Sequence, residues 1–285
     1  MFRLSAFADE ISPDPRLQVS VLKASRVRFI EFRSIFHTNV LALSDEQVRA
    51  FKTLIDGEGI GLSAIGSPVG KYPVDGDFAP HLDKLKRAIE LCGVLGTPNI
   101  RVFSFYPPGN DETFDPAGWP THRDEVIRRM TAMAELAARS NVVLFHENEH
   151  RIYGDSPERV RDVLSAVNSP ALRGAYDAAN YAYCGYDPVA GWEQTKEWTA
   201  HLHIKDWHTG GKDAGHVYGV LAGHGDGQIP HSTRDAVSRG YDGFAVLEPH
   251  LRTGGQFGGT TGPDLFPCAV EAFRTILRDC GGQEG

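Results

Sequence analysis

The chain has 285 residues, of which 41% are hydrophobic and 23% are charged, and its formal net charge is −8. This is the composition of an ordinary globular protein that is large enough for a substantial core. A net negative charge offers no basic surface to a polyanion, so nucleic acid is a poor candidate partner. No apolar run approaches the ~18 residues of a membrane-spanning helix, and the amino terminus lacks a signal-peptide pattern. Because the four cysteines also form no CxxC pair, we expect a cytoplasmic protein that binds neither nucleic acid nor membranes.

Short apolar runs rich in β-branched and aromatic residues alternate with segments of helical periodicity along the chain. The apolar runs predict strands at 4–8, 29–32, 60–65, 100–105, 142–145, 172–176, 201–206 and 243–247. The intervening segments predict helices at 15–25, 44–58, 78–95, 122–139, 155–167 and 188–198, a short helix before 243, and a last helix at 263–280. The glycine-rich tail after residue 280 is expected to fray.

Eight strand-then-helix units in one chain are the pattern of a closed (β/α)8 barrel, with parallel strands inside and helices outside. An open doubly wound sheet is the structural alternative. The chain has no internal linker and no surplus of residues for a second domain. We therefore predict a single (β/α)8 TIM barrel domain over residues 1–285.

Ionisable side chains gather where four of the predicted strands end. Glu147, Asp177 and Glu248 come soon after the apolar runs of the fifth, sixth and eighth strands, and His203 lies in the seventh. The carboxyl ends of all strands in such a barrel face one mouth, so these four side chains are predicted to converge. A single acidic residue at a strand end is commonly a helix cap or a salt-bridge partner. Four on consecutive strands indicate a functional site.

Three carboxylates and one imidazole carry a summed charge of −3, which burial makes costly unless it is compensated. A divalent cation would compensate it. Oxygen-rich ligation with one nitrogen favours Mn²⁺, our first expectation, or Mg²⁺ or Co²⁺, and is also compatible with Zn²⁺. His201 and His203 share one face of their strand, and we prefer His203 as the ligand because it lies nearer the carboxyl end.

With these residues placed, the chain resembles the xylose isomerase-like barrel superfamily of sugar isomerases and epimerases over nearly its whole length. The superfamily also holds hydroxypyruvate isomerase, inosose dehydratase and endonuclease IV. Bacterial proteins named only as sugar phosphate isomerase/epimerases share FADEISPD and SAIGSP as well. The motifs that carry the resemblance, in order and spacing, are HENEH, YDAANY, HLHIKD, AGHGDGQIP and GYDGFAVLEPHL.

The resemblance to ketose 3-epimerases implies that Glu147 and Glu248 are both metal ligands and the catalytic acid/base pair. A cation that holds a ketose carbonyl and an adjacent hydroxyl acidifies the neighbouring C–H and stabilises the enediolate. One carboxylate would remove the proton and the other would return it to the opposite face. The resemblance therefore implies a divalent-metal-dependent isomerase or epimerase acting on a ketose or keto-sugar derivative. Its members are often dimers or tetramers, so a homo-oligomer is compatible with it.

Several other residues are predicted to bind the substrate. HENEH supplies His146 and Glu149, and a glycine-containing loop supplies Lys71. Strand alternation makes His146 a packed core histidine if the strand extends that far, and Lys71 could be a solvated loop lysine.

Two positions depart from the ketose epimerases, which carry a histidine at Asn180 and an arginine at Thr209. Asn180 can still hydrogen-bond a substrate oxygen, but neither residue supplies a positive charge. The residues that could replace the missing cations are Lys205, His208, His216, His224 and His250. Lys205, which lies in HLHIKD, is therefore predicted to contact the substrate.

Three other functions compete with the epimerase. A lyase on the same metal would remove water or an aglycone from a keto-sugar, as inosose dehydratase and 3-oxo-glycoside-cleaving enzymes do. The sequence argues against an endonuclease IV-like nuclease, because the third and fourth strands end in GSP and SFY and lack the histidines for three zinc ions. A non-catalytic binding module is the last alternative.

Overall fold

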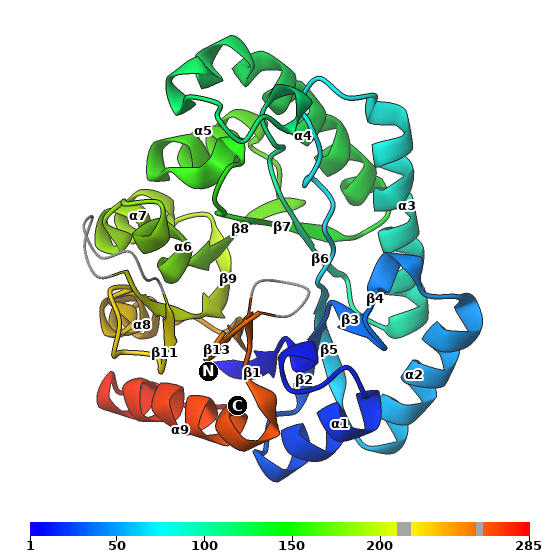
Figure 1. Ribbon diagram of the computed structural model, residues 1–285, viewed down its shortest axis with the longest axis vertical. Coiled ribbons are helices and arrows are strands. Elements are labelled where there is room, and N and C mark those ends of the chain that lie inside the picture. The colour runs from blue at the N-terminus through cyan, green and yellow to red at the C-terminus, as the bar shows by residue number, and fades with distance from the viewer. Residues whose placement is uncertain (210–217, 255–258) are drawn as a thin grey trace.

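The computed structural model describes residues 1–209, 218–254 and 259–285. Its centre is a closed barrel of parallel strands surrounded by helices, which confirms the predicted (β/α)8 fold (Figure 1). The barrel strands follow one another in chain order, and the last one closes the barrel against the first. They are β1 (Arg3–Ala6), β2 (Phe29–Phe32), β5 (Gly61–Ile65), β6 (Asn99–Val102), β7 (Val143–Glu147), β8 (Leu172–Asp177), β9 (Thr199–Ile204) and β12 (Phe244–Leu247).

The helices form an outer ring around these strands (Figure 1). They are α1 (Pro15–Ala24), α2 (Asp45–Gly57), α3 (Phe78–Leu95), α4 (Arg123–Arg139), α5 (Pro157–Val167), α6 (Ala178–Tyr183), α7 (Pro188–Thr195), α8 (Ile229–Ser238) and α9 (Gly262–Asp279). Local signals set their ends. Ser44 and Gln47 form the expected capping box at α2, and Gly96 ends α3 in the left-handed conformation. None of these described helices combines the length and the apolar character needed to cross a membrane.

Among the described residues, short antiparallel strand pairs, several 3-10 turns and the α-helix α6 depart from the predicted pattern. The pairs are β3 (Ser34–Ile35) with β4 (Thr38–Asn39), β10 (Asp206–His208) with β11 (Tyr218–Val220), and β13 (Arg252–Thr253) with β14 (Gly259–Thr260). The extra helix is α6, which begins directly after β8 because the Asp177 side chain accepts a hydrogen bond from the Asn180 backbone N–H at 2.9 Å.

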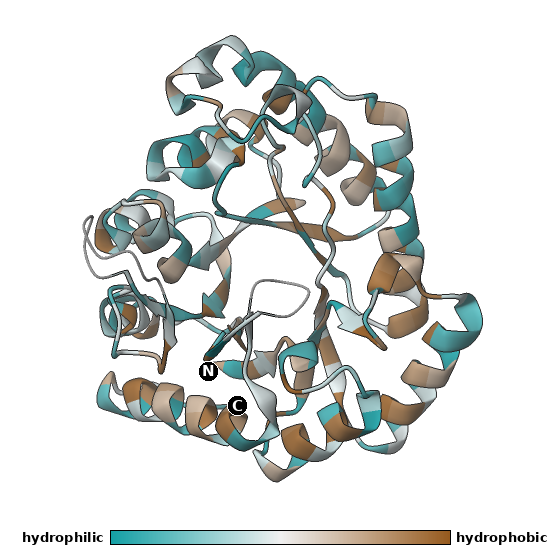
Figure 2. Ribbon diagram, viewed as in Figure 1, coloured by the Kyte–Doolittle hydropathy of each residue, from teal (hydrophilic) through white to brown (hydrophobic). Residues whose placement is uncertain are grey.

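The main apolar core lies between the barrel strands and the helices. Ile100, Leu144 and Leu172, on three neighbouring strands, are each no more than 1% exposed. Burial of such a side chain stabilises the fold by about 1.5–3 kcal/mol. Figure 2 shows apolar residues along the barrel strands and in stripes on the surrounding helices. The alternate strand positions point into the barrel, and there polar groups appear, such as the Ser5 and Ser63 hydroxyls, which are 2.7 Å apart.

The motif AGHGDGQIP forms a loop that surrounds the Asp206 carboxylate. The backbone N–H groups of Gly223, Gly225 and Gly227 donate to it at 2.8, 3.0 and 2.9 Å. A Cβ at Gly225 would lie 2.4 Å from Asp206 Oδ1, so this approach requires glycine. The motif therefore holds the chain that follows β9 and has a structural role.

The carboxyl-terminal tail does not fray, so that expectation is wrong. The Phe2 N–H donates to Gln283 O at 2.8 Å, and the Gly285 N–H donates to Phe2 O at 2.9 Å. Arg274 also binds the Glu284 carboxylate through Nε at 2.7 Å and Nη2 at 2.9 Å. These contacts hold the tail beside the start of β1, and Figure 1 shows the two termini close together. Pairing across such a sequence distance leaves no local signal.

Candidate metal centre and substrate cavity

The structure brings together the four residues that the sequence predicts as metal ligands. Glu147 ends β7, Asp177 ends β8, His203 lies near the end of β9, and Glu248 follows β12. One potential ligand atom from each side chain lies within 4.8 Å of the other three. All four residues are buried, with Glu248 the most exposed at 4%. The barrel register aligns Asp177 with His203 on adjacent strands, which accounts for part of this convergence.

The hydrogen bonding of these side chains leaves atoms directed at the cluster. One oxygen of Asp177 accepts a hydrogen bond from the Asn180 backbone N–H at 2.9 Å, and one oxygen of Glu248 accepts from Arg33 Nη1 at 2.6 Å. Their other oxygens, Asp177 Oδ2 and Glu248 Oε2, are buried and have no hydrogen-bond partner among the described residues. The same holds for both ring nitrogens of His203. Charged neighbours compensate them here, because Lys205 Nζ lies 2.9 Å from Asp177 Oδ2 and Glu147 Oε1 lies 2.9 Å from His203 Nδ1. Three carboxylates and one imidazole directed at one point are a ligand set that fits a divalent cation.

Each of the two glutamates has an arginine partner. Arg33 Nη1 donates to Glu248 Oε1 at 2.6 Å, and Arg101 Nη1 donates to Glu147 Oε2 at 3.2 Å. Both guanidinium groups also lie against the Phe7 ring, at 4.4 and 4.8 Å from its centroid. These charge-assisted hydrogen bonds orient the carboxylates and keep one oxygen of each occupied.

Lys205 adds a third buried cation. Its Nζ lies 2.9 Å from Asp177 Oδ2 and 3.5 Å from Glu248 Oε2. Burial would raise the pKa of Glu248, but Lys205, His250 and Arg33 outweigh it and hold this pKa well below its usual range. The three cations equal the three carboxylates in number. Net charge alone therefore does not require a metal, contrary to the expectation from the sequence, and the argument for a metal rests on the convergence of the four ligand side chains.

Protons compete with a cation for this cluster. Burial raises the pKa of Asp177 to about 6, although Lys205 opposes the shift. Burial would lower the pKa of His203, but Glu147 and Glu31 outweigh it and raise this pKa to about 10. A ligand must be deprotonated to bind a metal, so cation binding here would release protons.

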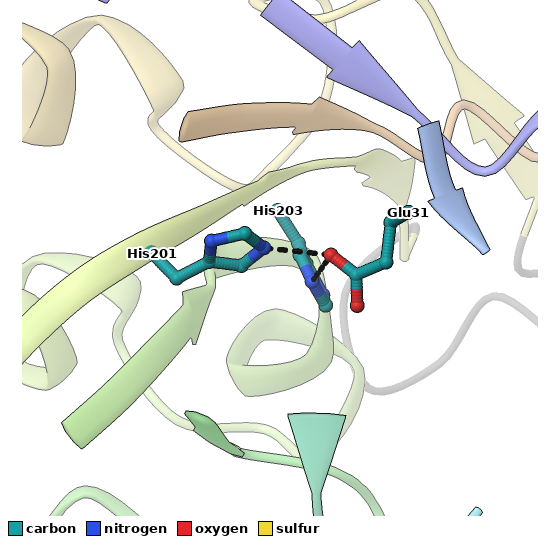
Figure 3. Close-up of side chains that lie close together, drawn as sticks. All are labelled: Glu31, His201 and His203. Atoms are coloured by element: carbon teal, nitrogen blue, oxygen red, sulfur yellow. Dashed lines mark hydrogen bonds and ion pairs between the residues drawn. The ribbon is translucent and has the colours of Figure 1, made fainter. Parts of the chain in front are cut away.

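A second buried group lies beneath the first and was missed by sequence analysis. Glu31, on β2, has its Oε2 at 2.6 Å from His201 Nε2 and at 3.4 Å from His203 Nε2 (Figure 3). None of the three side chains is exposed to solvent. A lone glutamate inside the apolar run Phe29–Phe32 was the available signal, because a buried charge in a strand needs a partner.

A cavity of about 570 Å³ opens above the cluster. It is lined by Glu147 and Glu248 and by four of the five residues predicted to bind substrate, namely Lys71, Glu149, Asn180 and Lys205. Lys71 Nζ donates to Glu149 Oε2 at 2.9 Å, so this lysine is directed into the cavity and paired there. Asn180 Nδ2 donates to Asn148 O at 2.8 Å and approaches Glu147 Oε1 at 3.4 Å.

His146, the fifth predicted substrate residue, does not line the cavity. β7 continues through Glu147, so alternation still applies and directs His146 to the opposite side of the strand from Glu147. Its ring lies against Gly154, where a Cβ would be only 2.5 Å from it. Burial lowers the pKa of His146 to about 4, so it is a neutral core histidine and its predicted role in substrate binding is corrected.

Basic side chains line the cavity, some at positions suggested by the sequence and some at positions that were missed. Among the five suggested replacements, Lys205 and His250 line the cavity, His208 and His224 do not, and His216 lies outside the described residues. Arg33 and Arg101 line it as well and were missed. Arg101 lies within β6, where a single charge among apolar residues was again the available signal.

Residues 21–275 match the family described as Xylose isomerase-like TIM barrel. The chain belongs to this family. Family members form an enzyme superfamily, and the similar proteins described below include an epimerase and a dehydratase. This confirms the resemblance found in the sequence, and the family does not fix the class of reaction.

One curated relative is the 3-dehydroshikimate dehydratase of Bacillus anthracis, which is 24% identical over 159 residues. The match covers 54% of this chain and 54% of the dehydratase, so the chain spans about half the length of the curated relative it matches.

Solved structures share the fold. The probable 3-DHS dehydratase AsbF from Bacillus anthracis has a TM-score of 0.73 at 18% identity, over 96% of this chain and 99% of that one. The 3-keto-D-glucoside 4-epimerase YcjR from E. coli has a TM-score of 0.68 at 15% identity, over 98% of this chain and 100% of that one. A xylose isomerase-like protein from Mycobacterium smegmatis in complex with magnesium has a TM-score of 0.71 at 18% identity, over 92% of this chain and 88% of that one.

Proposed function

We propose that the protein is a divalent-metal-dependent isomerase or epimerase that acts on a ketose or keto-sugar derivative. The observation that carries this proposal is the position of Glu147 and Glu248. Their carboxylates lie within 4.8 Å of each other, and they come from strands that are separated by β8 and β9 in the barrel. Two carboxylates that approach one small volume from different strands can serve the two faces of a planar intermediate.

Glu147, Asp177, His203 and Glu248 would hold the cation, with Mn²⁺ as the proposed metal and Mg²⁺, Co²⁺ or Zn²⁺ as alternatives. When bound, a divalent cation polarises a substrate carbonyl and so acidifies the adjacent C–H. The support for such a site in this chain is the convergence of three buried carboxylates and one buried imidazole, whose ligand atoms lie within 4.8 Å of one another.

The protein side chains would carry the proton transfer. One glutamate removes the proton from the carbon next to the carbonyl, and its arginine partner keeps it ionised until then. Return of a proton to the opposite face of that carbon gives the epimer, whereas return to the neighbouring carbon gives the isomer. Lys205 Nζ lies 3.5 Å from Glu248 Oε2 and helps to keep that carboxylate ionised, ready to accept a proton. Each positioned acid or base of this kind accelerates a reaction by about 100-fold to 10,000-fold.

The test is proton exchange in D₂O. Mn²⁺-loaded protein is incubated with a panel of ketoses and 3-keto-glucosides, and deuterium at the carbon next to the carbonyl is followed by NMR. We expect incorporation with the wild type, and a loss of at least about 100-fold in Glu147→Gln and Glu248→Gln. Glu112→Gln, at a side chain that is 80% exposed, is the matched control and should exchange normally. No incorporation by the wild type across the panel would refute the proposal.

A dehydratase is the second candidate, and the position of Lys205 favours it. After the same proton abstraction, the bond between the β-carbon and its hydroxyl oxygen would break, and the Lys205 ammonium would protonate the departing oxygen to give water. The partial sequence match to a 3-dehydroshikimate dehydratase supports this alternative. An enone absorption that appears with the wild type and disappears in Lys205→Met would establish it, whereas exchange without an enone would favour the epimerase.

A further inference from the structure

The group of Glu31, His201 and His203 lies inside the barrel and takes no part in the proton transfer described above. Figure 3 shows both imidazole rings directed at one oxygen of Glu31. The His201 Nε2 is 2.6 Å from Glu31 Oε2, and the His203 Nε2 is 3.4 Å from the same atom. All three side chains are fully buried. A buried carboxylate between two imidazoles therefore calls for an explanation.

The two nitrogens of His203 face different partners. Nδ1 lies 2.9 Å from Glu147 Oε1 and 4.0 Å from Glu248 Oε2, on the side of the ligand cluster. Nε2 lies on the side of Glu31. A histidine that binds a metal through one nitrogen carries its proton on the other and donates it to a carboxylate or carbonyl, which fixes the ring and raises its basicity.

We propose that Glu31 is a positioning residue that holds the proton of His203 on Nε2 and so presents Nδ1 to the cation. The inference rests on the metal site of the proposed function and deepens it. Glu31 acts through His203 and does not reach the cluster itself. Glu31 thereby determines which tautomer of His203 is present and where the Nδ1 lone pair of His203 points.

His201 holds Glu31 in place. Its Nε2 donates to Glu31, and its ring stacks on Phe145 with centroids 4.6 Å apart and an interplanar angle of 20°. Strand alternation places His201 and His203 on the same side of β9, and their rings meet edge to face at 5.4 Å. The order of contacts is therefore Phe145, His201, Glu31 and His203, which ends at the predicted ligand.

A second metal ion bound by Glu31, His201 and His203 is the competing interpretation. Two ligand atoms on one first-row metal at its usual bond lengths are about 3 Å or more apart. The 2.6 Å between His201 Nε2 and Glu31 Oε2 is the length of a hydrogen bond instead. The geometry therefore favours a carboxylate that is hydrogen-bonded to His201 and ion-paired with His203 over a second ligand set.

The test uses the full-length protein and two substitutions. E31L removes the acceptor, and E31Q keeps an acceptor oxygen of the same shape but removes the charge. Mn²⁺ affinity and stoichiometry are measured by calorimetry, and the ring nitrogens of His203 are followed by ¹⁵N NMR in the Mg²⁺-loaded protein. We expect one cation per wild-type chain, the Nε2–H tautomer of His203, and Mn²⁺ affinity about 10-fold to 100-fold weaker in E31L.

E31Q keeps the test decisive if E31L does not fold. Its amide oxygen is a weaker acceptor than a carboxylate, so the Nε2–H proton resonance of His203 should move upfield while most of the affinity remains. S63A is the matched control, because it removes the buried hydrogen bond between the Ser5 and Ser63 hydroxyls inside the barrel and leaves Glu31, His201 and His203 in place. It should lower the melting temperature but retain wild-type affinity and the Nε2–H tautomer.

Different failures have different meanings. A wild-type protein that binds no divalent cation would overturn the metal centre and this inference together. Tight wild-type binding with unchanged affinity in E31L, or an unshifted His203 resonance in E31Q, would overturn this inference alone. Two cations per wild-type chain, with one lost in E31L, would also overturn it by showing that the group is itself a ligand set.

Discussion

Arg33→Met should be among the most destabilising substitutions at the mouth of the barrel. Arg33 is 3% exposed, and its guanidinium binds Glu248 Oε1 at 2.6 Å and Asp9 Oδ2 at 2.8 Å. Methionine preserves much of the apolar stem but leaves two buried carboxylates without this partner. Removing one side of a buried ion pair costs about 3–5 kcal/mol, because the remaining charge stays buried. We expect a loss of this size in the free energy of unfolding.

Urea denaturation at pH 7 measures this loss, with Arg239→Met as the matched control. Arg239 also binds a carboxylate, Glu197, at 2.7 Å, but both side chains are partly exposed, at 37% and 66%. Exposed pairs of this kind are worth less than about 1 kcal/mol. The reasoning would be refuted if Arg33→Met cost no more than the control. It would then follow that Asp9 and Glu248 are compensated without the arginine.

Two further predictions concern the loop above the barrel, and a third concerns the metal. His81 Nε2 accepts the Gly70 N–H at 2.7 Å, and burial lowers the pKa of His81 to about 4 from 6.5. As the pH falls below 6.5, His81 therefore binds a proton in the unfolded chain before it does so in the folded protein. Between pH 7 and 5 the free energy of unfolding of the wild type should fall by about 2 kcal/mol more than that of His81→Gln. Equal losses would contradict this prediction. Gly70→Ala should lower the free energy of unfolding by more than about 2 kcal/mol, because Gly70 has φ +96° and a Cβ there would lie 1.9 Å from Phe103 O. The control is Gly93→Ala in α3, where open space surrounds the new methyl group. It should be neutral or stabilising by up to about 1 kcal/mol. EDTA should lower the melting temperature of the purified protein. Mn²⁺ at 100 times its Kd should then raise the free energy of unfolding by about 2.7 kcal/mol. An unchanged melting curve would argue against the metal site.

Much of the fold could be predicted because its signals are local. The helix at 78–95 was predicted with its observed ends from its apolar spacing and from Gly96, which adopts the left-handed conformation at its end. The extra helix α6 was missed because it is only six residues long, which is too short to show a clear helical periodicity. The tail was mispredicted because its pairing with Phe2 depends on the closed barrel.

The site was predicted only in part, for a related reason. Glu147, Asp177 and Glu248 come at strand ends, where barrel geometry alone brings them together. Arg101 and Glu31 lie inside strands that otherwise read as apolar core, so their roles depend on what faces them across the barrel. A single charge within a buried strand is a signal that a partner exists, but the register of the closed barrel decides which residue it is.

Anomalous diffraction from Mn²⁺-soaked crystals tests the central claim most directly. The account predicts one anomalous peak per chain, bounded by Glu147, Asp177, His203 Nδ1 and Glu248, with Lys205 moved away from Asp177. A peak elsewhere, or none at saturating Mn²⁺, would contradict it.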